Sequence, residues 1–274
     1  MARPLADSRY PAFRSRLLSA LLLVPLALAG LWLGGWPFAL LVIAVVVAMA
    51  WEWGRLAPDP VTGAVAMTAA TLLPGLAVIL LLTGQPVLAL AAVALGTALA
   101  AALAVAARVG RVGHVAAGVV YLGLPALALV WLQTRPEIGS RLVLWLLLIV
   151  WSTDICAYAA GRSIGGAKLA PRISPGKTWA GLVGAMLGAG AVGAATGAAL
   201  GGRPSLAGLL GACLAVVAQA GDLFESALKR RRGVKDSSHL IPGHGGVLDR
   251  LDGLLFAAPA YAAVIALAPG IIVG

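Results

Sequence analysis

Charged residues crowd into one stretch near the C-terminus of this apolar chain. Asp222, Glu225, Ser226, Lys229 and Arg230 lie at i, i+3, i+4, i+7 and i+8. On a helix these spacings place all five side chains on one face. Charged groups in or beside lipid are costly, so they favour a functional role. An internal salt-bridge ladder, with Asp222 or Glu225 paired to Lys229, is the structural alternative.

The segment after this helix adds a glycine-rich turn and more carboxylates. The turn His244–Gly246 permits positive φ and close backbone approach, and its N–H groups can face phosphate oxygens. Asp249 and Asp252, together with Asp222, are hard oxygen donors of the kind that Mg²⁺ takes alongside substrate phosphates. A zinc site is disfavoured, because no cysteine lies nearby and no HExxH spacing is present.

A second polar patch lies about fifty residues upstream. Asp154, Tyr158 and Arg162 are one turn apart on a predicted helix, and the sequence S-P-G-K-T-W follows at 174–179. The G-K-T here is not a Walker A loop, because the first glycine of that motif is replaced by proline and no strand is expected before it. Lys177 and Thr178 precede an apolar segment, where a helix dipole and free N–H groups attract phosphate.

The elements that position these residues are membrane spans. The chain has 274 residues, of which 61% are hydrophobic and 11% charged, far from the composition of a soluble domain. The sequence predicts an all-α polytopic bundle of nine spans of about 20 residues each. They are expected at Leu17–Gly35, Trp36–Leu56, Gly63–Thr83, Val87–Ala107, Val115–Gln133, Leu142–Ala160, Trp179–Leu200, Leu206–Leu228 and Leu254–Ile272.

The predicted spans form a single integral domain, 1–274, because no repeat or linker interrupts them. Within it, 1–140 holds the N-terminal spans and 141–274 the catalytic spans and loops. The two cysteines, Cys156 and Cys213, both sit in apolar segments and favour packed free thiols over a disulfide framework.

The distribution of positive charge predicts the orientation. With the N-terminus in the cytoplasm and nine crossings, 17 of the 20 Lys and Arg residues fall on the inner side. This bias favours N-in and C-out, and places the polar loops 161–178 and 229–253 in the cytoplasm. A cleavable signal at the Arg-rich start, ending near Ala27–Ala29, is an alternative that leaves the downstream orientation unchanged.

Two isolated polar residues are expected to have structural and not catalytic roles. Glu52, between Trp51 and Trp53 near the end of the second span, is expected to be an interfacial anchor. His114, in a basic loop, is expected to be solvated.

The polar motifs resemble one known family. The run S-A-L-K-R-x4-K-D-S-x4-P-G-H-G-G-V-L-D-R-L-D, 226–252, is similar to the signature of the phosphatidate cytidylyltransferase (CDP-diacylglycerol synthase) family. The motifs at 221–226 and 174–179, and Asp154 with Ala157, Tyr158, Gly161 and Arg162, resemble other motifs of that family. The resemblance covers about 152–256. Ala180 departs from it where many relatives carry a polar residue, which puts one peripheral contact in doubt.

The resemblance implies transfer of CMP from CTP to phosphatidic acid, with Mg²⁺ and, as an option, a second cation such as K⁺. It implies catalytic roles for Asp222, Lys229, Asp249 and Lys177, with Asp222 and Asp249 as metal ligands within about 4–6 Å of each other. The implied substrate-binding residues are Ser174, Thr178, Ser226, Arg230, Lys235, His244, Gly245, Gly246, Arg250 and Asp154.

The expected setting is a bacterial-type inner membrane, with the active site facing the cytoplasm. The expected partners are CTP, phosphatidic acid and the bilayer, without nucleic acid, and a homodimer is compatible with the sequence. The nearest alternative is a CTP-dependent polyprenol or phytol kinase. An anion transporter is disfavoured because no inverted repeat is evident. A CDP-alcohol phosphotransferase is disfavoured because its closely spaced Asp cluster is absent.

Overall fold

Long apolar helices make up almost all of the structure. The computed structural model describes residues 21, 24–243 and 245–273. Eight of its helices are long and apolar enough to cross a membrane, and a shorter apolar helix, Val24–Leu33, precedes them. The long helices are α2 (Gly35–Arg55), α3 (Pro60–Leu82), α4 (Pro86–Ala106), α5 (Val112–Gln133), α6 (Gly139–Ser163), α7 (Trp179–Ala199), α8 (Pro204–Arg231) and α9 (Leu248–Leu267). The prediction of an all-helical membrane bundle is confirmed, with eight long spans described; the start of the predicted first span, Leu17–Gly35, lies outside the described residues.

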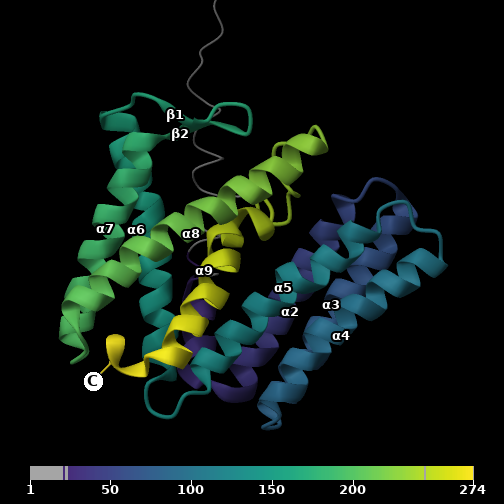
Figure 1. Cartoon of the computed structure of the whole chain (residues 1–274), viewed down its shortest axis with the longest axis horizontal. Coiled ribbons are helices and arrows are strands. Elements are labelled where there is room, and N and C mark those ends of the chain that lie inside the picture. The colour runs from purple at the N-terminus through teal and green to yellow at the C-terminus, as the bar shows by residue number, and fades with distance from the viewer. Residues whose placement is uncertain (1–20, 22–23, 244, 274) are drawn as a thin grey trace, which may run out of the picture.

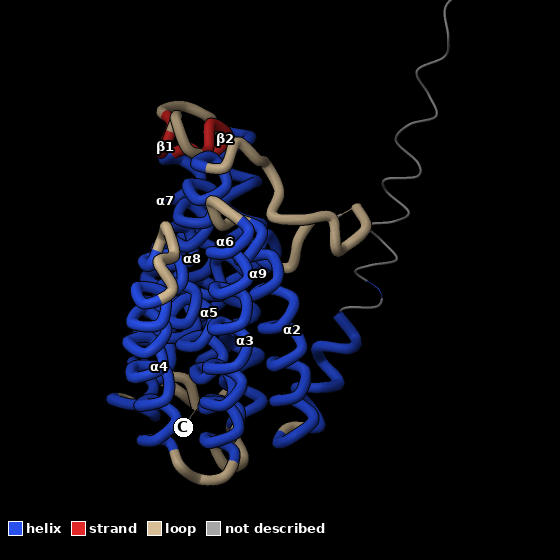
Figure 2. Tube along the Cα trace, turned by 90° about the vertical axis from the view of Figure 1, so that its right-hand side faces the viewer, coloured by secondary structure: helices blue, strands red, loops and turns tan. Residues whose placement is uncertain are grey.

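The helices alternate in direction, so the connections gather at two ends of the bundle. A hairpin of β1 (Lys168–Ala170) and β2 (Ser174–Thr178) lies at one end, which also receives the α8–α9 connection (Figure 1). The C-terminal 3₁₀ turn, Pro269–Ile271, lies at the other end (Figures 1 and 2). Both polar loops that the sequence singled out therefore lie at the same end.

Three features at the polar end of the bundle differ from the predicted ones. The hairpin was not predicted. Strand β1 precedes the G-K-T residues, and strand β2 contains them. Helix α8 runs on to Arg231, where three basic residues in its last turn complement the helix dipole. Helix α9 begins at Leu248 and ends at Leu267, so Asp249 and Asp252 belong to a helix instead of a loop. The predicted loop 229–253 is correspondingly shorter.

Two helices begin with side-chain caps that the sequence supplies locally. The carboxylate of Asp59 accepts hydrogen bonds from the backbone N (2.8 Å) and Oγ1 (2.6 Å) of Thr62 at the start of α3. These bonds favour the charged form and lower the pKa of Asp59. Thr178 caps α7, and its Oγ1 accepts a bond of 3.0 Å from the backbone N of Gly181. Both caps satisfy N–H groups that a helix start leaves unpaired.

Small residues let α6 and α7 pack closely. A Cβ added at Gly188 would lie 2.2 Å from the Sγ of Cys156, and one at Gly184 would lie 2.3 Å from the Cβ of Ala160. Close approach of this kind is typical of helix pairs in membranes. Cys156 and Cys213 are both free, as predicted, but only Cys156 is partly buried; Cys213 is exposed and not packed. The buried core is continuous across the two halves of the chain and includes Trp53 of α2 and Tyr261 of α9.

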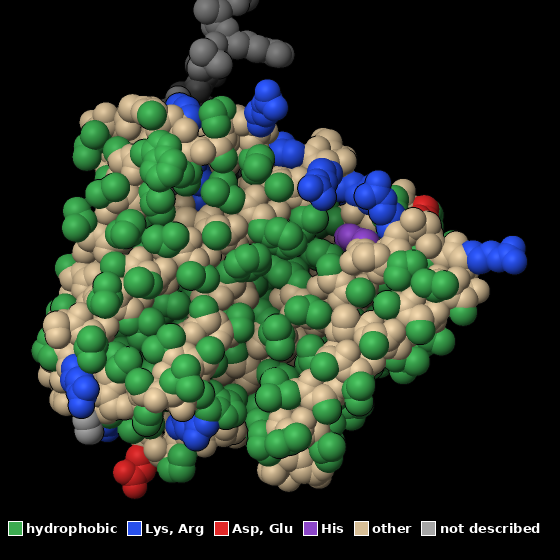
Figure 3. All heavy atoms as spheres, in the orientation of Figure 1, with side chains coloured by type: hydrophobic (Ala, Val, Ile, Leu, Met, Phe, Trp, Pro, Cys, Tyr) green, Lys and Arg blue, Asp and Glu red, His purple; other side chains and the backbone are tan. Residues whose placement is uncertain are grey.

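The outer surface is largely apolar. Hydrophobic side chains cover most of the face in Figure 3, and Lys and Arg gather mainly along its upper edge. Residues such as Leu95 and Leu187 are about 70% exposed, which suits contact with lipid. A patch of this extent would be unusual on a soluble monomer.

Candidate functional site

A polar cavity of about 510 Å³ opens between α6, the β2 strand, α7 and α8. Its walls combine small residues with charged and hydroxyl side chains from both polar patches of the sequence. The polar lining residues are Asp154, Tyr158, Arg162, Ser174, Lys177, Thr178, Gln219 and Asp222. The structure thus brings together three predicted substrate-binding residues, Asp154, Ser174 and Thr178, with the predicted catalytic residues Lys177 and Asp222.

Lys177 and Asp222 meet across this cavity. The Lys177 Nζ lies 2.5 Å from Oδ2 of Asp222 and donates a 2.5 Å hydrogen bond to Oε1 of Gln219. Their side chains are 15% and 31% exposed, so the pair is accessible from the cavity. Lys177 lies on β2 and not on the helix, whose cap is Thr178. Gln219 was missed, although its position three residues before Asp222 extends the same polar face.

Aromatic side chains mark the depth of the cavity. Tyr158, in its wall, is 68% exposed, and Trp179, at the first position of α7, is 55% exposed. Tyr and Trp concentrate at the membrane–water interface, because one side of the ring is apolar and the other carries a polar group. Two such rings beside the cavity fit a position of its mouth at the level of lipid headgroups.

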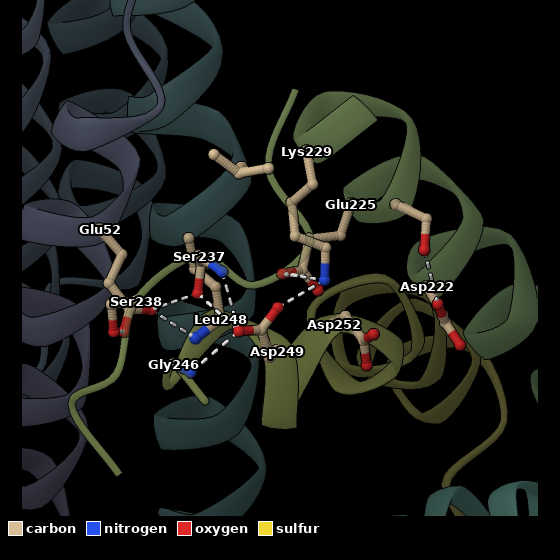
Figure 4. A network of polar contacts seen from close by, with 12 residues as sticks. Glu52, Asp222, Glu225, Lys229, Ser237, Ser238, Gly246, Leu248, Asp249 and Asp252 are labelled. Carbon is tan, nitrogen blue, oxygen red and sulfur yellow. Dashed lines mark hydrogen bonds and ion pairs between the residues drawn. The ribbon is translucent and has the colours of Figure 1, made fainter. Parts of the chain in front are cut away.

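A second ionic cluster lies at the junction of α8 and α9. The Nζ of Lys229 forms an ion pair with Oδ1 of Asp249, and lies 3.2 Å from Oε1 of Glu225 (Figure 4). The side chains of Glu225 and Asp249 are only 1% and 4% exposed. The ladder considered from the sequence is therefore present between Glu225 and Lys229. Ser226, also predicted as a site residue, donates to Oδ1 of Asp222 at 3.2 Å.

The two clusters lie close enough to interact electrostatically. Asp252 lies between Asp249 and Asp222 in the view of Figure 4. Asp252, Asp154 and Asp222 interact electrostatically with one another, and Arg250 interacts with Asp154. Across the two clusters, five carboxylates lie near four cationic side chains, Arg162, Lys177, Lys229 and Arg250.

This donor set fits a hard divalent cation in its chemistry. Carboxylate oxygens are the ligands that Mg²⁺ prefers. Among the described residues, no three His, Cys, Asp or Glu side chains converge to enclose an ion. A bound Mg²⁺ would therefore complete its shell with substrate phosphates and water, which is its usual habit.

The interpretation of Glu52 as an interfacial anchor is wrong. Its side chain is fully buried and accepts hydrogen bonds from Ser237, Ser238, Val247 and Leu248 (Figure 4). These partners lie 185 to 196 positions away in the sequence. A lone acid between two tryptophans carries no local sign of such partners, so the sequence could not indicate them.

The interpretation of His114 as a solvated residue is also wrong. Its ring stacks on Trp53 with centroids 4.5 Å apart and planes at 5°. Its Nε2 lies 3.0 Å from the backbone O of Trp53, and the Trp53 Nε1 donates to the backbone O of His114 at 3.1 Å. The histidine therefore joins α5 to α2.

Several predicted substrate-binding residues lie outside the cavity wall. Arg230 donates to the backbone O of Ile173 (3.3 Å) and of Val234 (3.2 Å), so it ties the hairpin loop to α8. Lys235 is exposed on the α8–α9 connection, and Arg250 is exposed on the first turn of α9. Gly245 has a φ of 88°, as the glycine turn predicts. His244 lies outside the described residues.

Known proteins resemble this chain over most of its length. Residues 14–268 match the cytidylyltransferase family. A protein of Brucella suis biovar 1 named phosphatidate cytidylyltransferase is 40% identical over 250 residues, which cover 89% of this chain and 90% of that protein. A protein of the same name from Pseudomonas aeruginosa is 42% identical over 267 residues, covering 92% and 96%.

Proposed function

Because the chain belongs to the cytidylyltransferase family, we propose that it transfers CMP from CTP to phosphatidic acid, giving CDP-diacylglycerol and pyrophosphate. The observation that carries this proposal is a charged cavity lined by Lys177 and Arg162, with the exposed aromatic residues Tyr158 and Trp179 beside it. A lipid phosphate can reach such a site from the bilayer, and a nucleoside triphosphate such as CTP can reach it from water.

The reaction asks for positioning and charge neutralisation. A phosphate oxygen of phosphatidic acid forms a bond to the α-phosphorus of CTP, and the bond to the pyrophosphate oxygen breaks. A phosphate monoester has a second pKa of about 6, so its oxygen is largely deprotonated at neutral pH and needs no general base. Lys177, held at the wall by Asp222 and Gln219, is placed to contact phosphate oxygens.

Asp222 and Asp249 are the proposed Mg²⁺ ligands. Mg²⁺ held there would supply positive charge against the phosphates of CTP and of the leaving pyrophosphate. Asp222 is the more accessible of the two, since it borders the cavity. Asp249 is buried, with Lys229 on one oxygen and three hydrogen-bond donors on the other, so it would bind Mg²⁺ only by exchanging one of these partners for the ion.

The direct test uses purified protein and labelled CTP. We expect pyrophosphate release only when phosphatidic acid and Mg²⁺ are both present. Label in the α-phosphate should enter the lipid, and label in the γ-phosphate should leave with pyrophosphate. Transfer of the γ-label to a lipid alcohol would instead identify a lipid kinase and contradict the proposal.

Lys177→Ala should lower kcat/KM by about tenfold or more, or about 1.4 kcal/mol in transition-state terms. The change removes an ammonium from the cavity wall and leaves the helices intact. Lys168→Ala is the matched control, because Lys168 is exposed on the partner strand of the same hairpin. Equal activity of the two variants would assign Lys177 to anchoring alone.

We propose that the hairpin end of the bundle faces the cytoplasm of a bacterial inner membrane, as the positive charge bias suggests. A labelling site in the connection between α8 and α9 must be exposed, which excludes Ser238 at 6% exposure. In a variant with both native cysteines replaced, Lys235→Cys should react with an impermeant maleimide in inside-out vesicles. Glu137→Cys, exposed at the opposite end, should react in right-side-out vesicles. The reverse pattern would overturn this orientation.

A further inference from the structure

Glu52 of α2 is a buried carboxylate in the half of the chain that supplies none of the cavity wall. Its Oε1 accepts hydrogen bonds from the Ser238 Oγ (2.5 Å) and the Val247 N (2.8 Å). Its Oε2 accepts from the Leu248 N (2.7 Å) and the Ser237 Oγ (3.2 Å). A buried carboxylate is costly unless it is hydrogen-bonded, and these four donors meet that need.

Two of the donors are backbone N–H groups at the start of α9. Val247 and Leu248 lie at the position where a helix leaves its N–H groups without intrahelical partners. The cap residue Val247 has no side-chain oxygen of its own. Glu52 therefore caps α9 from another helix, and this explains why α9 begins before the polar residues Asp249 and Asp252.

The same contacts orient Asp249. The Ser237 Oγ lies 3.0 Å from Oδ2 of Asp249 as well as 3.2 Å from Glu52, so this hydroxyl bridges the two carboxylates. The backbone N of Ser237 (2.9 Å) and of Gly246 (2.8 Å) also donate to Oδ2 of Asp249. Each of these donors lies in the segment that Glu52 holds.

The packing around Gly246 leaves little freedom in this arrangement. A Cβ there would lie 2.0 Å from the Ser237 Oγ and 2.5 Å from Oε1 of Glu52. Glu52, Ser237 and Gly246 therefore fit against one another closely enough to fix the turn. Asp249 in turn forms an ion pair with Lys229 of α8, which also pairs with Glu225 (Figure 4). The same helix carries Asp222.

We propose that Glu52 is a positioning residue for the reaction: it holds residues 237–238 and 246–248 at the two ends of the connection before α9 and thereby sets the orientation of Asp249. This inference rests on the proposed function for its kinetic consequence, because Asp249 is one of the proposed catalytic residues. Its structural part, the restraint of 237–238 and 246–248, stands on the hydrogen bonds alone.

Glu52→Gln tests the proposal with little change in shape. An amide has one accepting oxygen, so either Val247 or Leu248 would direct its N–H at an NH₂ group. We expect kcat for CMP transfer to fall about tenfold or more, with the KM for CTP within about threefold of wild type. Deuterium uptake should rise in 237–248 and stay unchanged in α3 and α4. Glu137→Gln, the same change at an exposed glutamate, is the control.

A double-mutant cycle with Ser238→Ala separates positioning from general stabilisation. If both residues act through the held segment, their combined loss of kcat should be smaller than the product of the single losses. Unchanged kcat in Glu52→Gln beside an active wild type would overturn the proposal, as would a rise in uptake spread evenly over all helices. An inactive wild type would instead refute the proposed function, while the exchange pattern would still test the restraint.

Discussion

Asp222→Asn should lower kcat/KM by about a hundredfold or more, equivalent to about 2.7 kcal/mol of transition-state stabilisation. Asparagine keeps the shape of the side chain and removes the charge that both Lys177 and the proposed Mg²⁺ require. The variant should stay folded, because the Asp222 side chain is 31% exposed in the cavity. Steady-state CMP transfer at several Mg²⁺ concentrations measures the effect.

Two comparisons make this result specific. Asp249→Asn should also lose most of its activity, and either variant should recover in part at higher Mg²⁺ or with Mn²⁺, because each change removes one charged ligand. Asp236→Asn, on the exposed connection between α8 and α9, should be much milder. An Asp222→Asn variant as active as Asp236→Asn would remove Asp222 from the proposed mechanism.

The spans could be predicted from sequence because lipid imposes a strong local constraint. A helix is the way a single segment satisfies its own backbone in hydrocarbon, so length and hydropathy suffice to find it. The predicted ends of α8 and α9 were wrong because polar residues continue each helix beyond its apolar stretch. Nothing within several positions of Leu248 identifies the cap of α9, because its acceptor is Glu52, 196 positions earlier.

The candidate site divides in the same way. Spacing placed Asp222, Ser226 and Lys229 on one face of α8, and topology placed Lys177 at the same end of the bundle. The sequence predicted that Lys177 binds phosphate, and it gave no sign of the ion pair with Asp222. That pair depends on how β2 packs against α8, which residues near Lys177 in the sequence do not reveal. Glu52 and His114 were misjudged for the same reason, since their partners are at least 61 positions away.

The buried ionic cluster gives the largest expected effect on stability. Lys229→Met should destabilise the protein by about 3–5 kcal/mol, because it leaves two buried carboxylates without their shared cation. The side chains of Glu225 and Asp249 are 1% and 4% exposed, so water cannot replace the ammonium. Methionine keeps most of the aliphatic volume, which limits any cavity effect. Thermal unfolding in a fixed detergent measures the change.

The double variant Lys229→Met/Glu225→Gln separates the charge effect from packing. Neutralising Glu225 removes one of the two uncompensated carboxylates, so this variant should unfold at a higher temperature than Lys229→Met alone. Lys235→Met is the matched control at an exposed lysine and should change stability by no more than about 0.5 kcal/mol. If Lys229→Met unfolds like this control, Lys229 cannot be the cation that neutralises the junction of α8 and α9. Failure of the Glu225→Gln change to restore stability would mean that methionine disturbs packing and not charge.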